Sequence, residues 1–195
     1  MQNREPCENC GKLVAPFQSV SLGSENGKYR HLCMACSNAE IAALSGIDFE
    51  HPNYLPVTYP DFDGIEHEFH FNTRLLGDRV AISALEVKDG EHRGYKFEVL
   101  GYDPEGDTFE LYNQLLDKTR RGLMQRHIKT DRCGLQIAKP DIVRARIDYD
   151  LENPDGGPLL IIDGKEVPWD EFGRMLTTFE GFQFRMEIYD MSEER

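Results

Sequence analysis

The chain lacks any apolar run that approaches the ~20 residues of a membrane-spanning helix. Its polar first eight residues also lack the basic and apolar regions of a secretory signal. Internal repeats and low-complexity tracts are absent as well. We therefore expect a soluble cytoplasmic protein without membrane partners. Its 195 residues, 39% hydrophobic and 29% charged, fit one ordinary globular domain with a small appendage.

Positive charge and recognisable catalytic motifs are also scarce. The chain has 22 Lys and Arg against 35 Asp and Glu, a formal net charge of -13, which would repel nucleic-acid phosphates. No nucleophile elbow, phosphate loop or dinucleotide fingerprint is present. Broad coating of DNA or RNA is therefore disfavoured, and no motif identifies a reaction.

The few cysteines, in contrast, are grouped. Cys7 and Cys10 form one Cys-x-x-Cys pair, and Cys33 and Cys36 form a second pair after 22 intervening residues. Under reducing conditions, two such pairs supply the four thiolates of a tetrahedral zinc site. Gly11 follows the first pair, where a tight turn needs a positive φ and a close approach of the backbone to sulfur. The sequence predicts one Zn²⁺ held by these four cysteines.

The residues around the cysteines predict a hairpin and a helix. Segments 17–22 and 28–32 have the character of short strands, and the Asn26-Gly27 dipeptide favours a hairpin turn between them. After Cys36, residues 37–44 have the character of a helix that begins at Ser37 or Asn38 and ends at Gly46.

The order of knuckle, hairpin, knuckle and helix over residues 1–46 resembles the treble-clef and zinc-ribbon-like group of four-cysteine zinc fingers. This resemblance implies a second ligand pair at the start of the helix and a structural metal, since four cysteines leave no open position for substrate. His31 is an alternative ligand, although its position on a strand directs it away from the metal. The fifth cysteine, Cys133, has basic neighbours but no specific base, so we expect an ordinary thiol.

The remaining chain predicts an acidic α+β domain. Residues 47–63 contain three X-Pro steps and form an extended linker, which leaves residues 64–195 as the larger domain after the zinc module of residues 1–46. Residues 108–129 and 168–179 have helical periodicity. Strands are expected at 66–71, 79–87, 95–100, 142–149, 159–162 and 182–189. The absence of regular strand-helix alternation favours a largely antiparallel sheet with two helices.

A second resemblance covers residues 159–190. A strand, a helix that contains Trp169 and a final strand are similar to those that follow a zinc knuckle in an uncharacterised bacterial group. No activity is implied by this resemblance.

Two groups of residues other than the cysteines are candidates for a binding or catalytic site. Lys118, Arg121 and Lys129 would share one helix face and could contact an anion or nucleic acid, although a solvated face would have the same pattern. His67 and His70 would chelate a metal only on a helix, because residues three apart on a strand point to opposite faces. His92 and His127 are the other histidines that an enzyme site could use.

These features favour a zinc-binding adaptor or regulatory protein that acts by binding another macromolecule, most simply another protein. Two alternatives remain open. One is an enzyme, such as a hydrolase, with its site in the α+β domain. The other is a nucleic-acid-binding protein that uses the zinc module with the basic helix.

Overall fold

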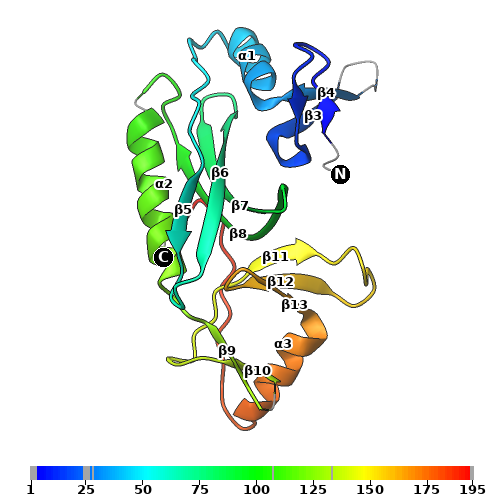
Figure 1. Cartoon of the computed structure of the whole chain (residues 1–195), viewed down its shortest axis with the longest axis vertical. Helices are drawn as coiled ribbons and strands as arrows, with labels where there is room; N and C mark the ends of the chain where they lie inside the picture. Colours follow the sequence, from blue (N-terminus) through cyan, green and yellow to red (C-terminus); the bar gives the residue numbers. More distant parts are fainter. Residues whose placement is uncertain (1–3, 24–26, 28, 107, 133, 194–195) are drawn as a thin grey trace.

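The structure, a computed structural model, describes residues 4–23, 27, 29–106, 108–132 and 134–193. Its described residues form an α+β fold with three α-helices and several antiparallel sheets, which is the fold class that the sequence predicts (Figure 1). The strands form separate small sheets, however, where one main sheet was expected. None of the helices in the described ranges is long and apolar enough to cross a membrane.

The amino-terminal module is built on the hairpin of β3 (Ser19–Gly23) and β4 (Tyr29–Cys33), as expected, although most of its turn, at residues 24–26, lies outside the described residues. A short 3-10 turn, η1 (Pro16–Gln18), precedes β3, and a two-residue ladder joins β1 (Glu5–Pro6) to β2 (Leu13–Val14). The expected start of the helix was wrong. α1 (Met34–Ser45) begins directly after Cys33, which is its N-cap residue, and Ser37 and Asn38 are buried within the helix. Gly46 ends it with a φ of 67°, as expected.

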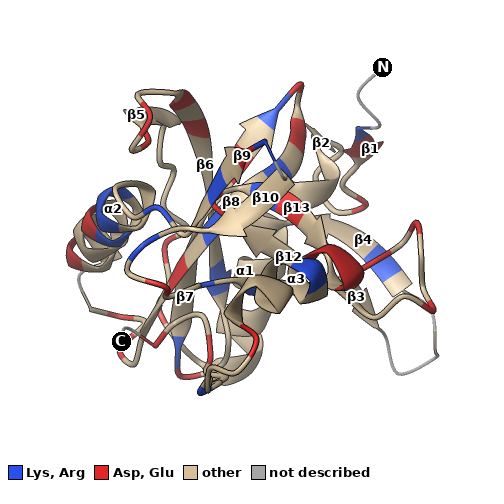
Figure 2. Ribbon diagram, turned by 90° about the horizontal axis from the view of Figure 1, so that it is seen from below, with Lys and Arg blue, Asp and Glu red and all other residues tan. Residues whose placement is uncertain are grey.

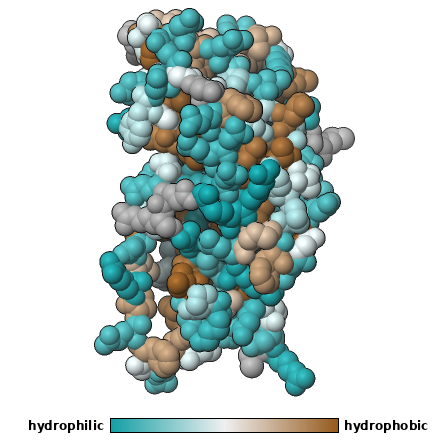
Figure 3. Space-filling model, turned by 90° about the vertical axis from the view of Figure 1, so that its left-hand side faces the viewer, coloured by the Kyte–Doolittle hydropathy of each residue, from teal (hydrophilic) through white to brown (hydrophobic). Residues whose placement is uncertain are grey.

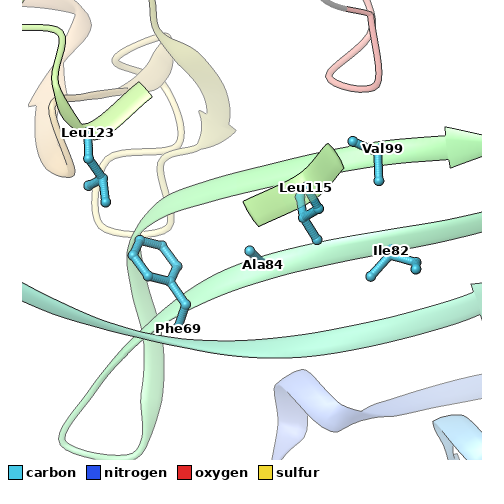
Figure 4. Packing of buried hydrophobic residues seen from close by; sticks show 6 residues of the cluster. All are labelled: Phe69, Ile82, Ala84, Val99, Leu115 and Leu123. Atoms are coloured by element: carbon cyan, nitrogen blue, oxygen red, sulfur yellow. The ribbon is translucent and has the colours of Figure 1, made fainter. Parts of the chain in front are cut away.

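The central unit is a four-stranded sheet in the order β5-β6-β7-β8, covered on one face by α2 (Thr108–Leu123). Its strands are β5 (Val57–Pro60), β6 (Glu66–Leu75), β7 (Val80–Lys88) and β8 (Glu91–Gly101). The core packs Leu115 and Leu123 of α2 against Phe69, Ile82, Ala84 and Val99 of the sheet (Figure 4). The segment expected to be only a linker therefore contributes an edge strand, β5, and Pro60 is tolerated there because an edge has unpaired positions.

α2 ends six residues earlier than the periodicity predicts. The Asp163 carboxylate accepts the backbone N–H groups of His127 and Ile128, both at 2.8 Å, which turns the chain into a hairpin. β9 (Ile128–Asp131) and β10 (Gly134–Ile137) form that hairpin. Lys129 therefore lies on a strand, and its predicted place on the helix face with Lys118 and Arg121 is wrong.

The carboxy-terminal unit is a three-stranded sheet in the order β11-β12-β13 with α3 (Trp169–Leu176) packed on it. Its strands are β11 (Arg146–Tyr149), β12 (Pro158–Ile162) and β13 (Lys165–Pro168), and a 3-10 turn, η2 (Thr177–Phe179), follows α3. Leu160, Ile162, Val167 and Met175 form its core with Ile128. β13 was not expected, β11 is shorter than expected, and residues 182–189 form no strand although their alternation predicts one.

Side chains from one unit bond to the backbone of the next. Asn38 of α1 donates to the carbonyl of Thr73 at 2.8 Å and accepts the N–H of Leu75 at 3.0 Å, which fixes α1 on the end of β6. Asn72 bonds the carbonyl of Phe17 in the module. Arg146 donates to the carbonyl of Gly94 at 3.0 Å and so connects β11 to β8.

Candidate metal centre

The thiols of the two Cys-x-x-Cys pairs converge. The sulfurs of Cys7, Cys10, Cys33 and Cys36 all lie within 4.8 Å of one another, and the Cys10 and Cys33 sulfurs are 3.9 Å apart. A tetrahedral zinc with Zn–S bonds of about 2.3 Å has sulfur-sulfur edges of about 3.8 Å. The four cysteines are therefore arranged to hold one metal ion.

Local backbone geometry positions each pair. In the first pair, the N–H of Gly11 donates to the Cys7 carbonyl at 2.8 Å, and Gly11 adopts a φ of 73°. The space around Gly11 is open, so the positive φ, and not a close approach to sulfur, is what favours glycine there. In the second pair, Cys33 occupies the N-cap position of α1 without a side-chain capping bond, and Cys36 lies in the first turn of the helix.

Within the cysteine cluster, the pKa values of two thiols are shifted in opposite directions. Burial opposes ionisation of Cys7, but backbone N–H groups of Cys33, Cys10 and Asn9 outweigh it and lower its pKa to about 6. Burial raises the pKa of Cys36 to about 12, and the neighbouring sulfurs add to that rise. Four thiolates at this spacing need a bound positive charge, which a divalent metal supplies.

His31, the alternative ligand, does not join this group. Its Nδ1 lies 3.6 Å from a carboxylate oxygen of Glu5, and its ring is not among the four ligands that converge. Cys133 lies outside the described residues, so the expectation of an ordinary thiol there stays a prediction.

Two of the three predicted anion-binding residues line a pocket of about 200 Å³. Lys118 and Arg121 lie on its α2 side, whereas Lys129 is not part of its lining. Lys96 of β8, Arg146 of β11 and Arg144, two residues before β11, complete a cationic cleft. Sequence reasoning missed this cleft, because only tertiary packing brings these segments to α2. The Lys118 ammonium donates to the carbonyls of Glu98 at 3.0 Å and Met191 at 2.8 Å. Acidic residues alternate with basic ones on α2 itself (Figure 2).

A buried carboxylate that sequence reasoning also missed contacts His67. Glu86 is fully buried at the β-bulge of β7, and its Oε1 lies 2.5 Å from His67 Nδ1 and 2.7 Å from Lys88 Nζ. Its Oε2 accepts the N–H of Tyr95 at 2.8 Å, and His67 Nε2 lies 3.1 Å from Asp61. The sequence feature that could have indicated this buried carboxylate is a single glutamate within the largely apolar residues 80–87.

This network shifts the pKa of each member. The hydrogen bond to Glu86 raises the pKa of His67, against the effect of burial. Burial opposes the charge of Glu86, but bonds from His67, Lys88 and the Tyr95 N–H lower its pKa. The pKa of Asp61 is lowered in the same way, by the N–H of Ile65 and by His67. A carboxylate contacts each imidazole nitrogen of His67, so the ring is held between Glu86 and Asp61 in an ion network.

Of the other three candidate histidines, only His92 shares a partner residue with His67. His70 lies on the opposite face of β6, as strand alternation predicts, and bonds Glu68 at 2.6 Å. His92 Nδ1 lies 3.0 Å from the backbone carbonyl of Glu86, and His127 Nδ1 lies 3.0 Å from that of Ile142. His67 and His92 therefore both contact Glu86, His67 through the carboxylate and His92 through the backbone carbonyl, whereas His70 and His127 have other partners.

Comparison with known families gives three matches in succession along the chain. Residues 6–48 match a domain of unknown function (DUF7685), residues 50–124 match a second (DUF7686), and residues 127–193 match a third (DUF7713). Each model matches less than half of the chain, and none carries a functional description. No curated protein and no solved structure matches the chain.

Proposed function

We propose that the chain is a zinc-binding adaptor or regulatory protein of the cytoplasm, in which zinc is structural and a second protein is bound. The observation that carries this proposal is the convergence of four cysteine sulfurs within 4.8 Å. Four thiolates complete the tetrahedral coordination of Zn²⁺ and leave no position for water or substrate. Reduced cysteines are required for such a site, which favours a reducing compartment.

The zinc module forms one wall of a groove that suits a partner. This groove, of about 520 Å³, lies between the module, the uncovered face of the central sheet and β11. Phe17 and Met34 line it from the module, Arg74 and Lys96 from the sheet, and Ile147 from β11. Because Met34 directly follows the ligand Cys33, loss of the metal would change the shape of the groove. Phe17, Met34 and Ile147 offer apolar contacts to a partner, and Arg74 and Lys96 offer positive charge that an acidic partner would complement.

Affinity capture with the zinc-loaded chain, followed by reconstitution with the purified partner, tests the proposal. We expect the variant Arg74→Ala, in the groove, to weaken binding of that partner at least tenfold, and removal of zinc to abolish binding. Arg79→Ala is the matched control, because Arg79 is similarly exposed but lies outside the groove. Turnover of a substrate by the purified chain without any partner would contradict the proposal, as would equal binding by both variants.

The cationic cleft favours a second candidate function, the binding of a nucleic acid or another polyanion. Five cationic side chains, from α2, β8, β11 and the segment just before β11, line one pocket together with the carboxylates of Asp163 and Glu193. The net charge of -13 opposes this function at long range. Fluorescence anisotropy with a single-stranded oligonucleotide tests it. Affinity should fall steeply with salt and should fall further in the double variant Arg121→Ala, Arg144→Ala, whereas salt-independent or absent binding would exclude it.

A further inference from the structure

The cationic cleft lies where the central unit and the carboxy-terminal unit meet (Figure 1). α2 and β8 form one wall, and the other wall contains residues 144–146, Ile161 of β12 and Asp163. The cleft's volume of about 200 Å³ equals that of roughly seven water molecules, which is room for one small molecule. Junctions between folded units are common places for small ligands.

Part of the cleft wall is apolar and flat. Tyr95 and Phe97 point to the same face of β8, and their rings lie 5.9 Å apart at an interplanar angle of 14°. Gly122 of α2 approaches the Phe97 ring so closely that a Cβ would lie 2.3 Å from it. Ile161 adds an aliphatic contact from β12. Because aromatic rings favour offset-stacked and edge-on neighbours, this wall suits a planar apolar group.

Positive charge exceeds negative charge around this wall. Five cationic side chains line the cleft against two carboxylates, those of Asp163 and Glu193. The Asp163 carboxylate already accepts the N–H groups of His127 and Ile128, both at 2.8 Å, so part of its charge is compensated within the chain. A small anion in the cleft would therefore meet a locally positive potential.

Carbonyl oxygens position the Lys118 ammonium in the cleft. It donates to the backbone carbonyls of Glu98 at 3.0 Å and Met191 at 2.8 Å, which orient it and carry no formal charge. The Lys96 ammonium lies 3.9 Å from the Glu98 carboxylate, beyond hydrogen-bond distance. Arg121 is exposed and so lies toward the mouth of the cleft. Ammonium and guanidinium groups of this kind bind carboxylates and phosphates.

Two neutral donors in the cleft complement the cations. Among the described residues, neither the Tyr95 hydroxyl nor the Gln125 side-chain amide has a hydrogen-bond partner. Burial and the nearby Asp163 carboxylate raise the pKa of Tyr95, so its hydroxyl stays protonated and can donate. Gln125 follows Arg121 by four residues, about one helical turn, so the two side chains lie on the same side of α2 and its end. A ligand oxygen would satisfy these donors.

We propose that the cationic cleft binds a small oxyanion carried on a planar apolar ring, either a phosphate ester or a carboxylate. The ring would lie against Tyr95 and Phe97. The oxyanion would accept hydrogen bonds from Arg121, Gln125 and the Tyr95 hydroxyl. This inference rests on anion binding at the cleft, as the second candidate function does, but it names a ligand that enters the pocket instead of a polyanion that crosses its mouth.

Isothermal titration calorimetry on the full-length zinc-loaded chain tests the proposal with four probes: phenyl phosphate, benzoate, inorganic phosphate and phenol. We expect phenyl phosphate or benzoate to bind once per chain with a Kd below about 1 mM. Inorganic phosphate and phenol should bind roughly tenfold more weakly, because each lacks one half of the ligand. The tighter of the two ring-bearing anions identifies the oxyanion. Equal binding of inorganic phosphate, or no binding of either ring-bearing anion, would overturn the proposal.

Variants of the cleft locate the bound probe. Arg121→Gln should weaken binding of the ring-bearing anion roughly tenfold, because it removes a charged donor. Tyr95→Phe keeps the ring and should weaken binding about threefold through loss of the hydroxyl. Arg120→Gln is the matched control, since Arg120 is the neighbouring exposed arginine of α2 and does not line the cleft. Binding that all three variants leave unchanged would overturn the proposal.

An oligonucleotide titration on the same preparation separates this proposal from the second candidate function. A chain that binds phenyl phosphate or benzoate but no oligonucleotide supports the small-ligand site and excludes that function. A chain that binds the oligonucleotide but neither ring-bearing anion overturns the small-ligand site alone.

Discussion

Replacing Glu86 by glutamine removes a buried negative charge while keeping the size of the side chain. The wild-type carboxylate contacts His67 at 2.5 Å, Lys88 at 2.7 Å and the N–H of Tyr95 at 2.8 Å, so it links β6, β7 and β8. Removing one member of a buried charge network costs about 3 kcal/mol of unfolding free energy. We therefore expect Glu86→Gln to be about 3 kcal/mol less stable than the wild type at pH 5.5.

The sign of the pH dependence follows from the shifted pKa values. The pKa of His67 is raised, so its contribution is complete below about pH 6.5 and is lost as the pH rises through the folded-state value. The pKa values of Glu86 and Asp61 are lowered, so their contribution is present above about pH 4.5 and is lost as the pH falls through the folded-state values. The penalty of Glu86→Gln should therefore be largest between about pH 4.5 and 6.5.

Urea unfolding followed by circular dichroism at pH 5.5 and pH 8.5 measures this penalty. Glu68→Gln is the control, because Glu68 makes a similar contact with His70 at 2.6 Å but is 55% exposed, and such a pair contributes about 0.5 kcal/mol. Equal losses in the two variants would refute the reasoning. A penalty for Glu86→Gln that is the same at both pH values would refute the role of charged His67.

Three other predictions concern the contacts between elements. Asn38→Ala should lower the unfolding free energy by about 2–3 kcal/mol, because it leaves the buried Thr73 carbonyl and Leu75 N–H without their hydrogen-bond partner. Chemical unfolding measures this loss, and Asn113→Ala, on the exposed face of α2, should change the unfolding free energy little. Gly122→Ala should destabilise the protein by about 1–3 kcal/mol, because the added Cβ would lie 2.3 Å from the Phe97 ring. Thermal denaturation should separate it from Gly173→Ala on α3, whose added Cβ meets no atom within 4 Å and should stabilise the protein by about 0.5–1 kcal/mol. A chelator should release the metal and increase amide hydrogen exchange in residues 7–45, while α2 and its sheet keep their protection. Unchanged exchange in the amino-terminal module would contradict a structural metal.

The elements with strong local signals were predictable from the sequence. The cysteine spacing predicted the cluster of four thiols that could hold a metal ion, and alternation located β6, β7 and β8, because a half-buried strand imposes a period of two. The end of α1 at Gly46 was also predictable, since its positive φ favours glycine.

The features that depend on contacts between distant segments could not be predicted. α2 stops before Lys129 because Asp163, about 35 residues later in the chain, captures the N–H groups of His127 and Ile128. The burial of Glu86 depends on a β-bulge, and the cationic cleft depends on packing between α2 and β11. Residues 182–189 have strand periodicity, but a strand also needs a partner edge, which periodicity does not reveal.

The surface of the molecule differs from one region to another in its hydrophobic content. The face that carries α2 is mainly hydrophilic, with hydrophobic side chains gathered in small patches (Figure 3). The most exposed apolar run of the described chain is the segment 182–188.

Elemental analysis of the purified, reduced chain tests the central claim most directly. One zinc per chain is predicted for the wild type, and none for a variant in which Cys7, Cys10, Cys33 and Cys36 are all replaced by serine. A wild-type chain without metal would contradict the account, and so would zinc that remains bound after all four cysteines are replaced.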